Sequence, residues 1–229
     1  MDTLSTIWQG LDWSRLTDIL LSVIPALVCI TLHELSHGYV AYRLGDMTAK
    51  RAGRLTLNPL KHLDIVGLLM MAVFHFGWAK PVPVDMRNFK NPKRGMALTA
   101  LAGPVSNVLI TAAALFIYGL LYFPLCDGGS TAQALLTTVG NIGYLSAAYA
   151  VFNILPIPPL DGSKVFLSVL SDEAYARLMR YERFGMLLLI LLAVTNALDA
   201  TLGAAAQWLF DRLFFFARWG WDISRMLFT

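Results

Sequence analysis

The segment His33-Glu34-Leu35-Ser36-His37 has the residue types and the spacing of a metal-dependent hydrolytic site. Residues four apart on an α-helix share a face, with Cβ atoms about 5–6 Å apart. Two imidazoles at that spacing can bind one zinc ion, each at about 2.0–2.1 Å. Glu34 lies roughly 100° around the helix, close enough to contact a water molecule on the metal. Such a carboxylate can act as the general base that takes a proton from water and passes it to a leaving amine.

The surroundings of this motif favour metal binding over a charged surface face, which is the alternative in a soluble helix. The motif lies within an apolar stretch, residues 19–44, which as a helix would be about 39 Å long and could cross a bilayer. Ionisable residues at that depth are costly and are usually functional. A bound zinc ion would satisfy both imidazoles.

A catalytic zinc ion needs a third protein ligand and one open position. The other two glutamates, Glu173 and Glu182, do not follow the motif on a nearby helix. Asp161 is a better candidate because it follows a proline-broken apolar stretch, where backbone at membrane depth lines a cavity or is buried in protein. The alternative for Asp161 is the N-cap of a helix that starts near Gly162. Weaker ligand candidates are Cys29, His62 and His75.

The composition indicates that lipid is the solvent for much of the chain. Of its 229 residues, 57% are hydrophobic and 14% are charged, against about 25% charged in soluble domains. Further apolar stretches cover residues 96–123, 131–160 and 184–210. We therefore expect one membrane-embedded domain over residues 1–229, an all-α polytopic protein with about four to five transmembrane helices. In the C-terminal part, 184–228, we expect a span followed by an interfacial amphipathic helix, or a fifth span starting near Ala200.

The loop between the first two stretches is expected to contain two further elements. Residues 65–76 are apolar but too short to span, which favours a re-entrant or interfacial segment. The alternation of Val82, Val84 and Met86 predicts a short strand or hairpin, confined to an edge by its prolines. Such an edge could pair with an extended peptide.

The charge distribution predicts the orientation in the membrane. Nine of the 18 lysines and arginines lie between Gly45 and Gly95, which places that loop on the cytoplasmic side. The N-terminus is then extracytoplasmic, and Asp161 returns to the cytoplasmic side. The formal net charge of +3 is too small to indicate a nucleic-acid partner.

Three motifs occur in the order His33-Glu-Leu-Ser-His-Gly38, Ala102-Gly-Pro-Val-Ser-Asn107 and Asn153-Ile-Leu-Pro-Ile-Pro-Pro-Leu-Asp-Gly162. Together they resemble the site-2 protease family of intramembrane zinc metalloproteases, over roughly residues 20–170. The resemblance implies that Asp161 is the third zinc ligand and that Asn153 acts near the reaction centre. It also implies that Asn107 belongs to an element beside the site.

The function that we expect is hydrolysis of peptide bonds in membrane-spanning substrates, with water activated by zinc and with Glu34 as the general base. Asn153 is a candidate donor of a hydrogen bond to the developing oxyanion. The partners are then the lipid bilayer and a transmembrane protein or peptide, and the protein is an integral, multi-pass membrane protein. The alternative is a membrane metal-binding protein without proteolytic activity, such as a carrier or sensor. Against it, metal binding alone does not require Glu34.

Overall fold

The computed structural model describes residues 13–74, 78–179 and 182–228, and within these ranges the chain is helical. The long helices are α2 (Trp13–Arg43), α5 (Pro92–Leu125) and α6 (Ser130–Asn153). The remaining elements are α3 (Thr48–Arg51), η1 (Pro59–Lys61), α4 (Ile65–Phe74), η2 (Met86–Asn88), α7 (Asp161–Leu167), α8 (Asp172–Met179), α9 (Glu182–Val194), α10 (Asp199–Leu213) and α11 (Phe215–Phe228). His75 and Phe76, the end of the predicted re-entrant segment, lie outside the described residues.

Three helices in the described ranges are long and apolar enough to cross a membrane, and they agree with the first three predicted spans. They are residues Val23–Arg43 of α2, together with α5 and α6. A fourth span is possible only if the bent pair of α9 with α10 and α11 counts as one. The helical class is therefore confirmed, with three to four candidate spans where four to five were expected.

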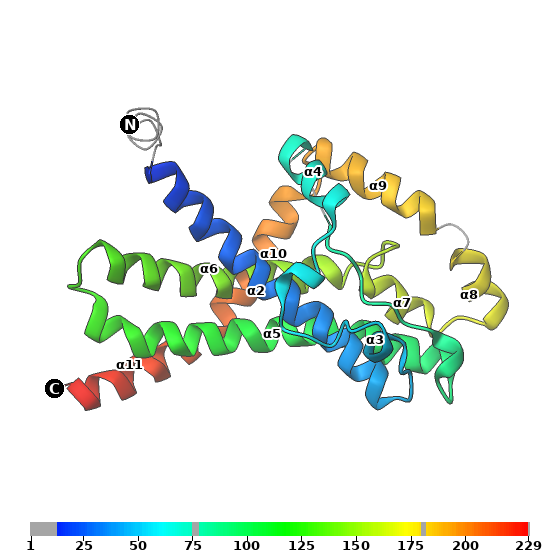
Figure 1. Ribbon diagram of the computed structural model, residues 1–229, viewed down its shortest axis with the longest axis horizontal. Coiled ribbons are helices and arrows are strands. Elements are labelled where there is room, and N and C mark those ends of the chain that lie inside the picture. Colours follow the sequence, from blue (N-terminus) through cyan, green and yellow to red (C-terminus); the bar gives the residue numbers. More distant parts are fainter. Residues whose placement is uncertain (1–12, 75–77, 180–181, 229) are drawn as a thin grey trace, which may run out of the picture.

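The three long helices pack against one another and bring their functional ends together. Figure 1 shows α5 and α6 running side by side, joined by a short turn, while α2 crosses over both. The C-terminal end of α2, the N-terminal end of α5 and the C-terminal end of α6 lie at the end of the bundle opposite that turn. The loop with α3 and α4 starts and finishes at this same end.

Local sequence explains where two of these helices start and stop. At the start of α5, the Asn91 side chain accepts a hydrogen bond from the backbone N–H of Arg94, and Pro92 occupies the first turn, where its missing N–H costs nothing. At the end of α6, the helix stops at Asn153, ahead of Pro156, as the proline run predicts.

The C-terminal region differs from the single continuous span that was expected over residues 184–210. The helix breaks between Val194 and Asp199, where Asn196 adopts a left-handed conformation with φ of 52°, and the two parts meet at 90°. The predicted interfacial helix, residues 209–228, forms the end of α10 and the whole of α11, and α11 packs closely along α5 (Figure 1). Small residues at this contact, Ala217 and Gly220, let the two backbones approach each other.

The strand predicted in the loop between α2 and α5 is wrong. In the described residues the loop contains one isolated antiparallel bridge, between Leu63 and Ala79, and no strand over residues 82–86. The physical reason is that Pro81 and Pro83 remove two of the N–H groups that a ladder requires. The N–H of Val82, which remains, donates to a side chain of α2.

Asp46 fastens the two ends of this loop to each other. Its fully buried carboxylate accepts hydrogen bonds from the backbone and hydroxyl of Thr48, from Asp85 N at 2.8 Å and from Asn88 Nδ2 at 2.7 Å. Burial alone raises the pKa of Asp46, but these donors outweigh that effect and hold the pKa below its usual value.

Replacing Asp46 with Asn should therefore destabilise the protein. The amide keeps one acceptor oxygen but loses the charge, and the expected cost is about 2 kcal/mol, measured as a lower thermal transition in detergent. Because the folded pKa of Asp46 is depressed, its contribution is full above about pH 4 and declines as the pH falls through the folded value. The exposed Asp127 provides the control, and an Asp127→Asn variant should match the parent. Equal thermal transitions in the Asp46→Asn and Asp127→Asn variants would show that the hydrogen bonds of Asp46 do not stabilise the loop.

Candidate metal centre

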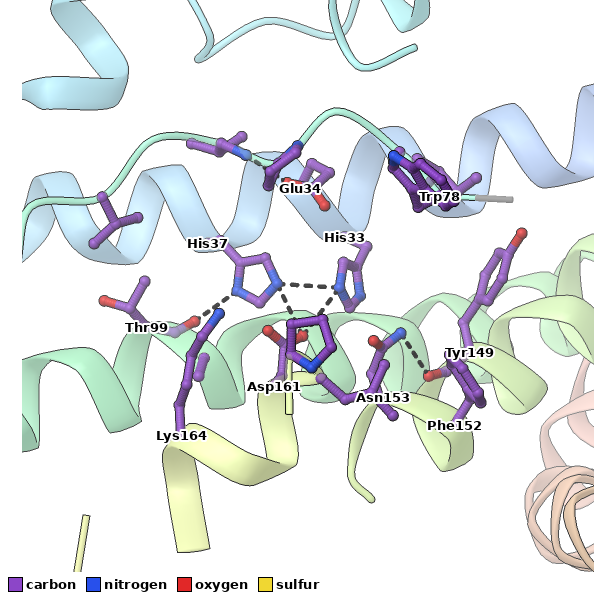
Figure 2. Close-up of a pocket in the computed structure, with 18 of the residues that line it drawn as sticks. His33, Glu34, His37, Trp78, Thr99, Tyr149, Phe152, Asn153, Asp161 and Lys164 are labelled. Atoms are coloured by element: carbon purple, nitrogen blue, oxygen red, sulfur yellow. Dashed lines mark hydrogen bonds and ion pairs between the residues drawn. The ribbon is translucent and has the colours of Figure 1, made fainter. Parts of the chain in front are cut away.

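His33 and His37 lie one turn apart on α2 and direct their imidazoles toward the same point. Their Nε2 atoms are 3.0 Å apart. Asp161 Oδ2 lies 3.2 Å from His33 Nε2 and 3.1 Å from His37 Nε2. All three residues are buried, and Figure 2 shows the three polar groups meeting between α2, α5 and α7. The structure thus brings together His33, His37 and Asp161, which we call the triad.

Asp161 reaches this position because α7 starts tightly against the end of α6. The N-cap of α7 is Leu160, so Asp161 is the first helical residue rather than the cap. Next to it, Gly162 lies so close to α6 that a Cβ there would be 2.0 Å from the carbonyl oxygen of Ile154. Only glycine fits this approach, which fixes the carboxylate of Asp161 opposite the two histidines.

The triad suits a zinc ion in its donor atoms and their spacing. A tetrahedral zinc ion with bonds of about 2.0–2.1 Å separates its ligand atoms by about 3.3–3.4 Å, close to the three observed separations. Asp161 Oδ2 is buried and has no hydrogen-bond partner among the described residues. A carboxyl group must be deprotonated to bind zinc, so Asp161 would bind the ion as a carboxylate.

Both imidazoles are oriented from behind by α5, as ligands of a metal usually are. His37 Nδ1 lies 2.7 Å from the carbonyl oxygen of Thr99, which can accept its proton and leave Nε2 for the metal. His33 Nδ1 lies 3.2 Å from the side-chain amide of Asn107. A metal on His33 Nε2 leaves the proton on Nδ1, so the amide must present Oδ1 there. That oxygen is buried without a partner, and rotating the amide by 180° supplies the bond.

Gly103 of α5 makes room for the imidazoles. A Cβ at this position would lie 2.5 Å from His33 Cε1 and 2.5 Å from His37 Nε2. The absence of a side chain therefore allows α2 and α5 to hold the two rings between them.

Glu34 lies beside the triad on α2, and its carboxylate is held by a contact with another part of the chain. Its Oε2 accepts a hydrogen bond of 2.8 Å from the backbone N–H of Val82 in the loop between α2 and α5, and Figure 2 shows the loop passing over this carboxylate. Pro81 and Pro83 on either side have no N–H, so Val82 is the donor that this stretch can offer here. The second oxygen of Glu34 remains available for proton transfer.

A cavity of about 410 Å³ opens onto the triad and Glu34. Asn153 lines it, with Nδ2 donating to the carbonyl oxygen of Tyr149 at 3.1 Å. Because an amide nitrogen carries two protons, one remains for a ligand. The rest of the lining is mostly apolar and includes Trp78, Phe152, Met186 and Leu189.

The weaker ligand candidates lie apart from the triad or outside the described residues. Cys29 is buried against α6, where Ser146 Oγ donates to its sulfur at 3.1 Å. His62 is buried in the loop, with Nε2 facing the carbonyl oxygen of Thr56 at 2.9 Å, and His75 is not described. Sequence reasoning missed Val82, Thr99 and Gly103. Of these three, only Val82 could have been noticed in the sequence. The prolines on either side lack an N–H, so the N–H of Val82 is isolated and needs an acceptor outside a strand ladder.

Comparison with known proteins identifies the family to which this site is related. Residues 122–195 match the model of peptidase family M50, a segment that includes Asn153 and Asp161. Over 100 residues, covering 44% of this chain and 46% of the relative, the chain is 50% identical to "Putative zinc metalloprotease YwhC" of Bacillus subtilis. It is 28% identical over 190 residues to "Putative zinc metalloprotease Rip2" of Mycolicibacterium smegmatis, covering 81% of this chain and 71% of the relative.

These matches confirm the resemblance to the site-2 protease family, which is peptidase family M50. The printed names of these relatives describe putative zinc metalloproteases, and the described part of this chain has three helices that could each span a membrane. The match to YwhC covers less than half of that relative. No solved structure matches the chain. The individual roles of His33, Glu34, His37, Asn153 and Asp161 remain predictions.

Replacing Gly103 with Ala should weaken metal binding without unfolding the bundle. The new methyl group would push both imidazoles away from Asp161, and we expect zinc affinity to fall about tenfold or more. The measurement is zinc per chain by mass spectrometry after dialysis against a mild chelator. Gly140→Ala on α6 is the matched control, because a Cβ there would meet its nearest neighbour at 3.7 Å. Undiminished zinc in Gly103→Ala would place the ion elsewhere.

Proposed function

We propose that this protein is an intramembrane zinc metalloendopeptidase that hydrolyses peptide bonds of membrane-spanning substrates. The observation that carries the proposal is the convergence of three ligand atoms, which lie 3.0, 3.1 and 3.2 Å from one another on buried residues, with the Glu34 carboxylate beside them. Buried, apolar surroundings and a cavity open to the triad suit a site that works on an apolar peptide.

His33, His37 and Asp161 would hold the metal, and Glu34 would move the proton. When bound, zinc supplies Lewis-acid activation of water and of the scissile carbonyl. Glu34 takes the proton of the attacking water on its second oxygen, while Val82 N–H holds the first one still. Glu34 then delivers that proton to the nitrogen of the leaving amine, which completes hydrolysis of the peptide bond.

Asn153 would bind the oxygen of the scissile carbonyl. Figure 2 shows its side chain in the cavity next to Asp161. The Nδ2 proton that does not face Tyr149 can donate to the oxygen as negative charge develops there. Because this interaction strengthens in the transition state, it accelerates the reaction rather than only tightening substrate binding.

The substrate must be unwound before it can be cut, since a transmembrane helix hides its amide groups. The segment from Trp78 to Val84 forms one wall of the cavity. Its prolines lack N–H groups and the Val82 N–H is already used, so it offers a substrate carbonyl oxygens and apolar side chains rather than a complete strand edge.

The reaction would take place within the bilayer, closer to the cytoplasm. With the N-terminus outside, α2 leaves the membrane near Arg43, and His37 lies about 9 Å and His33 about 15 Å from that end along the helix axis. Asp161 follows the cytoplasmic end of α6, at the same level.

Replacing Glu34 with Gln should leave zinc binding intact and abolish cleavage. Gln keeps an oxygen for the Val82 N–H but cannot take a proton, and we expect at least a 100-fold loss in the rate of cleavage. The measurement pairs zinc content with cleavage of membrane-protein substrates found by comparing the proteomes of cells with active and substituted protein.

Asp161→Ala is the companion variant, since it should lose zinc and cleavage together. Normal cleavage by Glu34→Gln would exclude Glu34 as the general base, whereas the absence of cleavage by the zinc-loaded parent would support a metal-binding protein without proteolytic activity. Full zinc occupancy in Asp161→Ala would remove Asp161 from the ligand set.

The orientation can be tested by labelling with a membrane-impermeant thiol reagent. With Cys126 replaced by Ser, a Lys90→Cys protein should be labelled only after the cells are opened, and a Gly129→Cys protein in intact cells. Both positions are exposed and lie at opposite ends of the bundle. The reverse pattern would invert the proposed topology and move the site toward the outer face.

A further inference from the structure

Lys164 is a cation inside the candidate active-site cavity for which the proposed mechanism has no use. Among the described residues that line the cavity, it is the only lysine or arginine, and the only carboxylates are those of Glu34 and Asp161. Lys164 lies one helical turn after Asp161 on α7, so the two side chains share a face of that helix.

Both cavity carboxylates are engaged with other groups. Asp161 faces the two histidines, and Glu34 accepts the hydrogen bond of Val82. Within the described part of the chain, Lys164 has neither a hydrogen bond nor an ion pair. The charges of a bound zinc ion, Asp161 and Glu34 would sum to zero, so the half-buried Lys164 contributes the net positive charge of the described cavity lining.

The position of Lys164 separates it from the group that would bind the scissile carbonyl. Figure 2 shows Lys164 rising from α7 toward the His37 end of the triad, where Thr99 lies, whereas Asn153 lies toward the His33 end. A peptide lying across the triad would therefore meet Asn153 at one end and Lys164 at the other.

We propose that Lys164 binds a carboxylate of the substrate beside the scissile bond, so that this protein selects peptides with an acidic side chain or a chain-end carboxylate at that position. The inference rests on the proposed proteolytic function. A charge-assisted hydrogen bond in a cavity of low polarity is strong, and it would offset the desolvation of both groups. Lys164 is then a specificity-determining residue, and the oxyanion is left to zinc and Asn153.

The test measures binding separately from cleavage. The Glu34→Gln protein, loaded with zinc in detergent, is titrated with fluorescent apolar peptides in which one Glu is moved along the sequence, each with a Gln twin. A second pair carries a free or an amidated C-terminus. At one position or at the chain end, we expect the carboxylate form to bind about tenfold tighter.

Substitutions of Lys164 in the Glu34→Gln protein test whether its ammonium group causes the preference for the carboxylate form. Lys164→Gln should abolish the preference, Lys164→Arg should keep it, and Lys164→Glu should shift it toward peptides with Lys at the same position. Lys61→Gln, at an exposed lysine outside the cavity, should bind like the parent. Zinc content and the thermal transition of each variant establish that it is folded.

Two results would overturn the inference: no preference for the carboxylate form in the protein with Lys164, or a preference that persists in Lys164→Gln. A uniform loss of cleavage rate for all peptides, with equal binding, would assign Lys164 to the transition state and would also overturn it. The proposed function can fail while this inference holds. That result would be a parent protein, with Glu34 unchanged, that binds these peptides with the expected preference but cuts neither them nor any membrane protein.

Discussion

The arrangement of the site depends on one constraint, which is that three ligand atoms of buried residues must be held close together. His33 Nε2, His37 Nε2 and Asp161 Oδ2 lie within 3.2 Å of one another, and the aspartate oxygen has no hydrogen-bond partner in the described chain. Without a cation this arrangement would be unfavourable in apolar surroundings. The bundle must therefore hold the three groups together, and α5 does so with Gly103, Thr99 and Asn107.

The features that follow from local patterns could be predicted from the sequence. The spacing of His33 and His37 sets their common face, and the prolines after Asn153 end α6 and expose Asp161 to the cavity. The three long helices follow from uninterrupted apolar stretches. Asp161 could not be distinguished from an N-cap by its residue type, because that choice depends on Gly162 packing against Ile154, a contact decided by tertiary structure.

Features that depend on distant contacts could not be predicted. Val82 and Glu34 are 48 positions apart, and this contact takes the N–H that an edge strand would have used. The alternation around Val82 was misleading as a sign of a strand. A loop that packs one side against a helical bundle shows the same period-two hydrophobicity. Likewise, the apolar stretch of 184–210 gave no sign of its break, apart from Asn196, a residue type that tolerates left-handed backbone.

Glu34 shares α2 with His33 and His37, but its carboxylate is oriented by a different part of the molecule from the triad. Long helices and the start of α7 fix the triad, whereas a loop fastened at Asp46 fixes Glu34 through Val82. Because the loop contributes no ligand to the triad, a displacement of residues 79–85 would change the orientation of Glu34 while leaving the ligand atoms in place. The bond between Glu34 and Val82 therefore joins this carboxylate to one wall of the cavity, whereas the three ligand atoms of the triad are held among α2, α5 and α7.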